Sequence, residues 1–396
     1  MSHVAPVEDL DRRPDEVDAA ADPGADPPDL GQKVLVLQGG GALGAYQVGV
    51  YQALAEGGMT PDWVIGTSIG AINAAIIAGN RPEDRLSRLA AFWARVEHGG
   101  WAHAAVGAGL LGQGWADSLV MAAGIPGFFE PHLQAMFGPH ANLGAEHAGL
   151  YRTEPLRRTL TELIDFDRLN AGPMRLTVGA ANLRTAEMRY FDSRYEALTP
   201  THILASCALP PAFPAVRIDG DLYWDGGIVS NTPVEAVFDD NPRRSGLVFC
   251  VHLWNPDGPE PDSLAKVIAR EKDVRYFSRA ASHIARQKQL HRLRHVITEL
   301  VGHLPEDVRD RAEVRKLAAY GCTTRMHVIR LLAPQLRGET STKDIDFSPQ
   351  GVRARWRAGH ADTLRALGKA PWTRPHDDLE GFILHEIEAG EPIQTS

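Results

Sequence analysis

The stretch VLQGGGALGAYQVGVYQAL, from Val36 to Leu54, decides the fold of this chain. It continues an apolar, β-branched run, Lys33–Gln38, passes through closely spaced glycines and ends with apolar residues at helical spacing. This order predicts a buried parallel strand, a glycine turn and a helix. Unpaired N–H groups and the positive end of the helix dipole meet at such a turn, which favours an anion or an oxyanion formed during a reaction.

The glycines in Gly39–Gly44 also have the G-x-G-x-x-G spacing of a dinucleotide-binding loop. That function needs an acidic residue at the end of the second strand, roughly 20 residues further on. The second predicted strand, Trp63–Ile65, has Asp62 at its start and leads into Gly66–Gly70, GTSIG. The sequence therefore argues against a dinucleotide site.

The segment Gly66–Gly70 is a G-x-S-x-G motif followed by a helix of small residues, which is typical of a nucleophile elbow. The sharp turn presents the Ser68 hydroxyl above the carboxyl edge of the sheet. Gly66, Gly70 and Ala71 are small enough to avoid clashes across the turn. A purely structural glycine-rich helix start is the alternative, and the strand and glycine loop upstream favour a nucleophile.

A nucleophilic serine needs a base. The segment Arg217–Trp224 predicts a hairpin that turns at Asp219-Gly220-Asp221 and delivers Asp225-Gly226-Gly227 at its end. Glycines after an aspartate permit close backbone approach at the edge of a site. An ordinary Asp-Gly turn would have the same sequence, so this segment alone leaves both interpretations open.

Three segments in this order, Gly39–Gly44 (GGGALG), Gly66–Gly70 (GTSIG) and Asp225–Gly227 (DGG), resemble the patatin-like phospholipase family, and the similarity extends from Lys33 to Trp254. The resemblance implies a three-layer α/β/α hydrolase with a mostly parallel sheet. It also implies a lipid acyl hydrolase without a catalytic histidine.

The resemblance assigns roles to individual residues of this chain. It implies a catalytic dyad of Ser68 and Asp225, and an oxyanion hole formed by backbone N–H groups of Gly39, Gly40 and Gly41. The remaining motif positions are glycines: Gly44, Gly66, Gly70, Gly226 and Gly227. A Ser-His-Asp hydrolase also uses G-x-S-x-G, and sixteen histidines leave it open on composition; the motif order and the DGG segment argue against it.

The chain departs from the family pattern at two positions. Gln38 stands where relatives often have an acidic residue or serine, and Leu43 stands where they usually have a cation. A phosphate would lack that cationic partner. We therefore predict from Leu43 that neutral esters are preferred over anionic phospholipids.

Composition is typical of a globular enzyme, with 396 residues of which 44% are hydrophobic. The net charge of −9 resides mostly in the first thirty residues, which hold nine acidic residues and two arginines. We predict a disordered acidic tail at residues 1–31 and no nucleic-acid partner. The sequence has no signal-peptide pattern and no apolar run near the roughly 20 residues of a membrane span. Three dispersed cysteines suggest buried thiols in the cytoplasm.

We predict a catalytic domain at residues 32–254 and a largely helical C-terminal extension at residues 255–396. A cap-like insert at about residues 91–151 holds aromatic residues that form either a second small core or a cap over an acyl pocket. The extension begins with a long helix or a helix pair, Asp262–Val301, with an apolar stripe of Val267, Val274, Phe277, Ala281 and Ile284. Its basic face either is solvated or contacts an anionic membrane. A strand at Met326–Leu332 and a helix from Ser348 to about Leu367 follow.

The sequence thus predicts a serine acyl-ester hydrolase of the phospholipase type, acting on a lipid or other acyl ester. The alternatives are an intracellular esterase on hydroxyalkanoate oligomers and a membrane- or partner-binding protein on a hydrolase scaffold. No H-E-x-x-H, cysteine–histidine or EF-hand motif occurs, so we predict no metal and no cofactor. We expect a cytoplasmic location, with peripheral contact to the inner membrane as a variant. The oligomeric state is left open.

Overall fold

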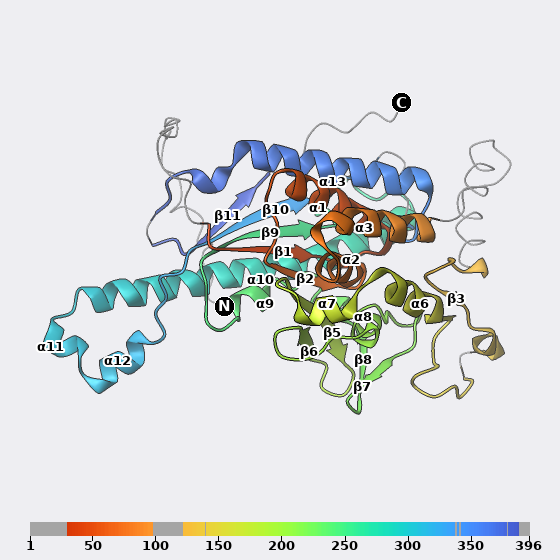
Figure 1. The fold of residues 1–396 in the computed structure, drawn as a ribbon, viewed down its shortest axis with the longest axis horizontal. Coiled ribbons are helices and arrows are strands. Elements are labelled where there is room, and N and C mark those ends of the chain that lie inside the picture. Colours follow the sequence, from red (N-terminus) through yellow and green to blue (C-terminus); the bar gives the residue numbers. More distant parts are fainter. Residues whose placement is uncertain are drawn as a thin grey trace, which may run out of the picture.

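The computed structural model describes residues 30–97, 122–138, 140–336, 339, 342–377 and 379–387. Residues 1–29 of the predicted acidic tail and residues 98–121 of the predicted cap-like insert lie outside the described residues. The fold that follows is therefore that of the predicted catalytic domain and most of the predicted extension (Figure 1).

Nine strands within the described residues form one mixed sheet, in the order β11-β10-β9-β1-β2-β5-β8-β7, with β6 also paired to β5. The strands are β1 (Gln32–Leu37), β2 (Trp63–Thr67), β5 (Arg175–Asn182), β6 (Met188–Asp192), β7 (Val216–Ile218), β8 (Asp221–Asp225), β9 (Gly246–His252), β10 (Met326–Leu332) and β11 (Phe382–Glu386). From β11 to β5 the neighbours run parallel, whereas β6, β7 and β8 pair antiparallel. The predicted mostly parallel sheet is confirmed.

Alternating side chains of β1 divide the core into two halves, because successive residues of a strand point to opposite faces. Leu35 and Leu37 join the cluster that includes α1 (Ala45–Glu56), α2 (Ile69–Ala78), α3 (Pro82–Val96) and α13 (Pro349–Lys369). Val34 and Val36 join the cluster with α9 (Glu235–Phe238) and α10 (Leu264–Gly302). Helices therefore cover both faces, and the predicted three-layer fold is confirmed (Figure 1).

The sheet continues past residue 254 into the C-terminal region, because β10 pairs with β9 and β11 pairs with β10. Helix α13 lies along α1 (Figure 1). Tyr46 of α1 donates a hydrogen bond to Asp362 of α13 at 2.8 Å, and Trp356 of α13 donates to Gln52 of α1 at 2.7 Å. These bonds fix the C-terminal region to the helix that follows the glycine turn.

Shorter elements complete the described fold. They are η1 (Gly41–Gly44), β3 (Glu130–Pro131), η2 (Leu133–Phe137), β4 (Tyr151–Arg152), α6 (Glu154–Leu163), α7 (Phe166–Ala171), α8 (Pro200–Ser206), η3 (Gly226–Ile228), α11 (Glu306–Arg309), α12 (Ala312–Ala318) and η4 (Pro371–Thr373). In the described part of the chain, every helix is too short or too polar to span a bilayer.

Candidate active site

The pairing of three strands brings Ser68 and Asp225 together. β2 pairs with β5 up to Thr67, which lies opposite Gly179, and β8 pairs with β5 from Asp225, which lies opposite Ala180. β6 pairs with the opposite edge of β5. β2 and β8 therefore lie on the same edge of β5, one after the other along its length. Ser68 follows β2 directly and Asp225 ends β8. The register of the sheet therefore places the predicted nucleophile beside the predicted base.

Ser68 lies in the turn between β2 and α2 with φ of 57° and ψ of −127°. A positive φ in a residue other than glycine costs about 1–3 kcal/mol, so the surroundings must hold it. Ser206 Oγ accepts from the Ser68 N–H at 3.0 Å, and Cys207 Sγ donates to the Ser68 carbonyl oxygen at 3.3 Å. A Cβ on Gly66 would lie 2.3 Å from the carbonyl oxygen of Gly70. The turn is as sharp and crowded as its sequence predicts.

Asp225 is buried, with 2% of its surface exposed. Its carboxylate accepts a hydrogen bond from the Gly227 N–H at 2.7 Å and faces the same cavity as Ser68. Burial raises the pKa of Asp225 to about 6, and the interactions of the carboxylate with the Ser68 hydroxyl and the Gly227 N–H limit the rise. At neutral pH this carboxylate is ionised and more basic than an ordinary aspartate. Burial also raises the pKa of the neighbouring Cys207 thiol well above its usual value, so that thiol stays protonated.

The glycine loop presents two N–H groups next to Ser68. The Gly39 carbonyl oxygen accepts from Asn231 Nδ2 at 3.0 Å and from Trp254 Nε1 at 2.9 Å. Because the peptide bond is planar and trans, the Gly40 N–H points away from that carbonyl. Among the described residues, no acceptor bonds the N–H of Gly40 or Gly41, and both glycines line the cavity with Ser68.

The Gly39 N–H differs from these two. It donates to the Asn231 carbonyl oxygen at 3.1 Å and is engaged within the protein. Gly41 needs to be glycine because its φ is +55° and a Cβ would lie 2.2 Å from the Asp344 carbonyl oxygen. The loop is therefore held rigidly from both sides.

Gln38, one of the two departures from the family pattern, is buried and forms hydrogen bonds to three other residues. Its Oε1 accepts from the N–H groups of Leu253 at 2.5 Å and Trp254 at 3.3 Å. Its Nε2 donates to Thr232 Oγ1 at 2.7 Å. A neutral amide satisfies both kinds of partner without burying a charge. Gln38 thus joins the end of β1 to the segments that hold the glycine loop.

A cavity of about 310 Å³ opens beside Ser68 and Asp225. Its apolar wall is largely aromatic and includes Phe128, Phe129, Tyr151, Phe213 and Phe347. Phe128 and Phe129 come from the predicted cap-like insert and are also buried in the main core. These two aromatic residues of the insert therefore both belong to the core and line the cavity. No histidine is among the described residues that line this cavity.

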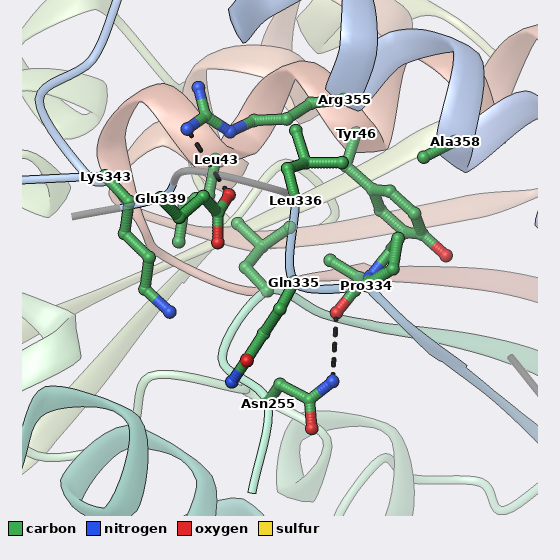
Figure 2. Close-up of a pocket in the computed structure, with 12 residues that line it drawn as sticks. Leu43, Tyr46, Asn255, Pro334, Gln335, Leu336, Glu339, Lys343, Arg355 and Ala358 are labelled. Atoms are coloured by element: carbon green, nitrogen blue, oxygen red, sulfur yellow. Dashed lines mark hydrogen bonds and ion pairs between the residues drawn. The ribbon is translucent and has the colours of Figure 1, made fainter. Parts of the chain in front are cut away.

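Leu43 does not lie where the sequence interpretation placed it. Its side chain is buried in a separate small pocket, among residues such as Tyr46, Leu336 and Arg355 (Figure 2). The premise that Leu43 leaves the active-site cavity without a cation is therefore wrong. The reason is that the short η1 helix turns position 43 toward α13 and the C-terminal region, which the sequence pattern alone does not reveal.

The cations of the cavity come instead from α10. Lys272 and Arg275 line it, together with Glu271. Lys272 Nζ forms an ion pair with Asp344 at 2.8 Å, and Arg275 pairs with Glu271. The Asp344 carbonyl oxygen accepts from the Ala42 N–H at 2.8 Å, so this residue connects α10 to the glycine loop.

No sequence motif predicts this contribution of the C-terminal region to the cavity. The only signal was the basic stretch Lys266–Arg294, which indicated a solvated or membrane-binding face. Part of that face lines the cavity, and contact with a membrane stays a prediction. Tyr276 of α10 also packs on Trp254, with ring centroids 4.8 Å apart, beside the glycine loop.

Two family models and several known proteins are similar to this chain. A family model described as patatin-like phospholipase matches residues 35–238, and a second, described as patatin phospholipase, matches residues 274–379. Among solved structures, VipD from Legionella pneumophila is similar over 90% of this chain and 72% of that chain, at 16% sequence identity and a TM-score of 0.39.

Curated relatives match part of the chain. The lysophospholipase nte1 of Aspergillus terreus is 27% identical over 266 residues, which cover 61% of this chain and 15% of that protein. An uncharacterized NTE family protein of Mycobacterium bovis is 25% identical over 236 residues, 59% of this chain and 53% of that protein. The matched region is thus only a fraction of the length of these relatives.

Proposed function

Since the chain belongs to the patatin-like phospholipase family, we propose that it hydrolyses acyl esters of lipids, with Ser68 as the nucleophile and Asp225 as its base. One observation carries the proposal: Ser68, in a sharp strand-to-helix turn, and the buried carboxylate of Asp225 lie at adjacent strand ends and line the same aromatic cavity. The cavity has the mostly apolar wall and few polar groups that a ligand with an acyl chain requires.

In the proposed reaction, Asp225 accepts the hydroxyl proton as Ser68 Oγ attacks the ester carbonyl carbon. The N–H groups of Gly40 and Gly41 stabilise the oxyanion of the tetrahedral intermediate. Asp225 returns the proton to the leaving alcohol, and an acyl-serine remains. Asp225 then takes a proton from water, the resulting hydroxide attacks the acyl carbonyl, and Ser68 leaves with that proton as the fatty acid departs.

Asn231 and Trp254 act through the glycine loop in this proposal. Both donate to the Gly39 carbonyl oxygen and so fix the direction of the Gly40 N–H. The N–H of Gly39 is engaged by Asn231, so the proposed oxyanion hole consists of Gly40 and Gly41 rather than all three glycines of the initial prediction.

Two cationic side chains beside the cavity favour a lipid with an anionic headgroup as the substrate. Lys272 and Arg275 line the same cavity as Ser68, each in an ion pair with a carboxylate of that cavity. A phosphate oxygen that replaced or shared such a carboxylate would form charge-assisted hydrogen bonds with these cations. A phospholipid or lysophospholipid is therefore the proposed substrate class. A neutral hydroxyalkanoate oligomer would use the apolar wall but not these cations.

The test is hydrolysis of a panel containing a lysophospholipid, a phospholipid, a neutral acyl ester and a hydroxyalkanoate oligomer. Ser68→Ala and Asp225→Asn should each lower kcat by about 10⁴-fold or more, because nucleophile and base act as a unit. Two matched variants serve as controls: Ser87→Ala on the exposed side of α3, and Asp221→Asn, whose carboxylate pairs with the exposed Arg184.

Wild type and both controls should have the same activity. Full activity in folded Ser68→Ala protein would contradict the dyad. Absence of hydrolysis in folded wild type on every substrate would instead favour a binding protein on a hydrolase scaffold.

A further inference from the structure

Three histidines from the C-terminal region meet at the edge of the sheet. His327 lies on β10, His385 lies on β11, and His376 precedes β11 in the segment after η4. In the parallel register His327 pairs with Ile383 and Ile329 pairs with His385, so both histidines point to the same face. Their rings stack at 5.3 Å with an interplanar angle of 8°.

The ring nitrogens of these residues converge. His327 Nδ1 and His385 Nε2 are 3.0 Å apart, and one ligand nitrogen from each of the three rings lies within 4.8 Å of the others. The His376 ring is 5.1 Å from that of His327 and 5.3 Å from that of His385. Two nitrogens on one tetrahedral metal ion, each at about 2.0–2.1 Å from it, would be about 3.3 Å apart. To reach this geometry the His327–His385 pair would separate slightly, and the wider separations within the cluster would shorten.

One ring nitrogen of His376 lacks the partner that a buried polar atom normally has. His376 Nε2 is buried and has no hydrogen-bond partner among the described residues. An unsatisfied buried polar atom destabilises the folded state relative to one with a partner. A hydrogen bond between His327 and His385 explains why these two rings lie together, but it does not explain why the His376 ring lies beside them with an unpartnered nitrogen. A ligand shared by all three rings explains both the pairing of the first two rings and the position of the third.

We propose that His327, His376 and His385 bind one divalent transition metal ion, with Zn²⁺ as the ion of best fit. Within the described residues the cluster contains no carboxylate or thiolate, and imidazole ligands favour Zn²⁺, Ni²⁺ or Cu²⁺ over Mg²⁺ or Ca²⁺. Water completes the coordination of the ion.

This site lies away from the candidate active site. His327 is level with Leu247 on β9 and therefore with Lys33 at the start of β1, whereas Ser68 follows the carboxyl end of β2. Val34 pairs with Trp63, so Lys33 is level with Asp62 of the segment before β2, which precedes Ser68 by six residues. Six residues of a strand span about 20 Å, which is the separation of the two sites along the strand direction. The ion thus has no contact with the proposed hydrolytic reaction. It joins β11 and the segment around His376 to β10, and so stabilises the edge strand of the sheet.

The experiment uses the full chain without an affinity tag that contains histidine. Protein treated with EDTA and dialysed is titrated with Zn²⁺ by calorimetry, and its Tm is measured with and without the ion. We expect one ion per chain and a Tm that rises with Zn²⁺ concentration, because the ion binds only the folded state. Ester hydrolysis at a temperature well below Tm should be the same before and after EDTA, which separates this proposal from the proposed active site.

Three variants locate the ion. His376→Ala and His385→Gln should each weaken Zn²⁺ binding by more than about 100-fold, beyond the loss known for outer-sphere partners. His303→Ala, at the exposed end of α10, should bind as wild type does. Co²⁺ added to wild-type protein should give the visible absorption of a site with nitrogen ligands, and addition of Zn²⁺ should abolish that absorption. This measurement uses only the wild type, so it does not depend on whether a variant folds. Folded wild type that binds neither ion, or binding that both cluster variants retain, would overturn the proposal.

Discussion

At the scale of single residues, the central feature is the buried carboxylate of Asp225. It accepts a hydrogen bond from the Gly227 N–H, yet burial still raises its pKa to about 6 from an ordinary value of 3.8. The folded state therefore binds this proton more tightly than the unfolded state does. Stability from this group is fully present below pH 3.8 and is lost as the pH rises to about 6. The proposed base thus destabilises the fold at the pH where it works.

This linkage predicts that Asp225→Asn stabilises the protein at neutral pH. A pKa shift of about two units lowers the free energy of unfolding of the wild type by about 3 kcal/mol once Asp225 is fully ionised. Part of this loss is already present at pH 5. The variant's advantage in free energy of unfolding over wild type should therefore grow by about 1–2 kcal/mol between pH 5 and pH 7.5. Urea unfolding at both values measures it. Asp221→Asn serves as the comparison, and an advantage for Asp225→Asn that did not change with pH would contradict the raised pKa.

At the scale of elements, α10 joins the C-terminal region to the cavity. It is a single helix, Leu264–Gly302, where the sequence predicts one helix or a helix pair over Asp262–Val301. The predicted packed stripe is wrong at Val267 and Val274, whose side chains are 47% and 49% exposed. The cavity-lining residues of this helix are charged or polar, and apolar periodicity does not detect such a face.

The position of Lys272 and Arg275 predicts a selective effect on substrates. Lys272→Gln and Arg275→Gln should each lower kcat/KM for an anionic phospholipid by about 10-fold or more, since a charge-assisted hydrogen bond is lost. A neutral ester of the same acyl chain should change by less than about 3-fold. Lys266→Gln is the matched control, because Lys266 pairs with Asp262 at the exposed start of the same helix. Equal losses on both substrates would indicate a structural role for these cations instead.

At the scale of the whole molecule, the C-terminal region is built into the fold of the hydrolase. It supplies β10 and β11 to the sheet and places α13 against α1. The two helices approach closely at glycines: a Cβ on Gly359 would lie 2.0 Å from the Tyr46 carbonyl oxygen, and one on Gly49 would lie 1.9 Å from that of Trp356. Because α1 follows the glycine loop, this contact also supports the site.

Gly359→Ala should therefore destabilise the protein, although alanine normally favours a helix over glycine. We expect a loss of about 1–3 kcal/mol, the usual cost of overpacking. Gly368→Ala on the same helix should instead gain about 0.5–1 kcal/mol, because nothing lies within 4 Å of its added Cβ. Thermal or urea unfolding of both variants measures the pair. A stabilised Gly359→Ala protein would contradict the close helix contact.

The sequence predicted those parts of the fold that local patterns encode. The strands that precede the glycine loop and Ser68, the helix cap at Ser348 and the strand at Met326–Leu332 are observed as expected. The short strand β11 and the direction of Leu43 were missed, because pairing with β10 and packing against α13 determine them.

The same limit applies to the sites. Ser68, Asp225 and the glycine loop stand in local motifs, and the structure brings them together. Lys272, Arg275 and the cluster of His327, His376 and His385 have no local motif, since their spacing in the sequence matches no known ligand pattern. Only the tertiary fold brings these groups to their partners.

The most direct test of the account is the rate at which a fluorophosphonate modifies Ser68, followed by mass spectrometry from pH 5 to pH 8. We predict a single modified residue, Ser68, and a rate that rises with an apparent pKa of about 6 as Asp225 ionises. In Asp225→Asn the rate should be low and should lack this step. Modification of another residue, or a step near pH 6 that persists in Asp225→Asn, would contradict the Ser68–Asp225 dyad.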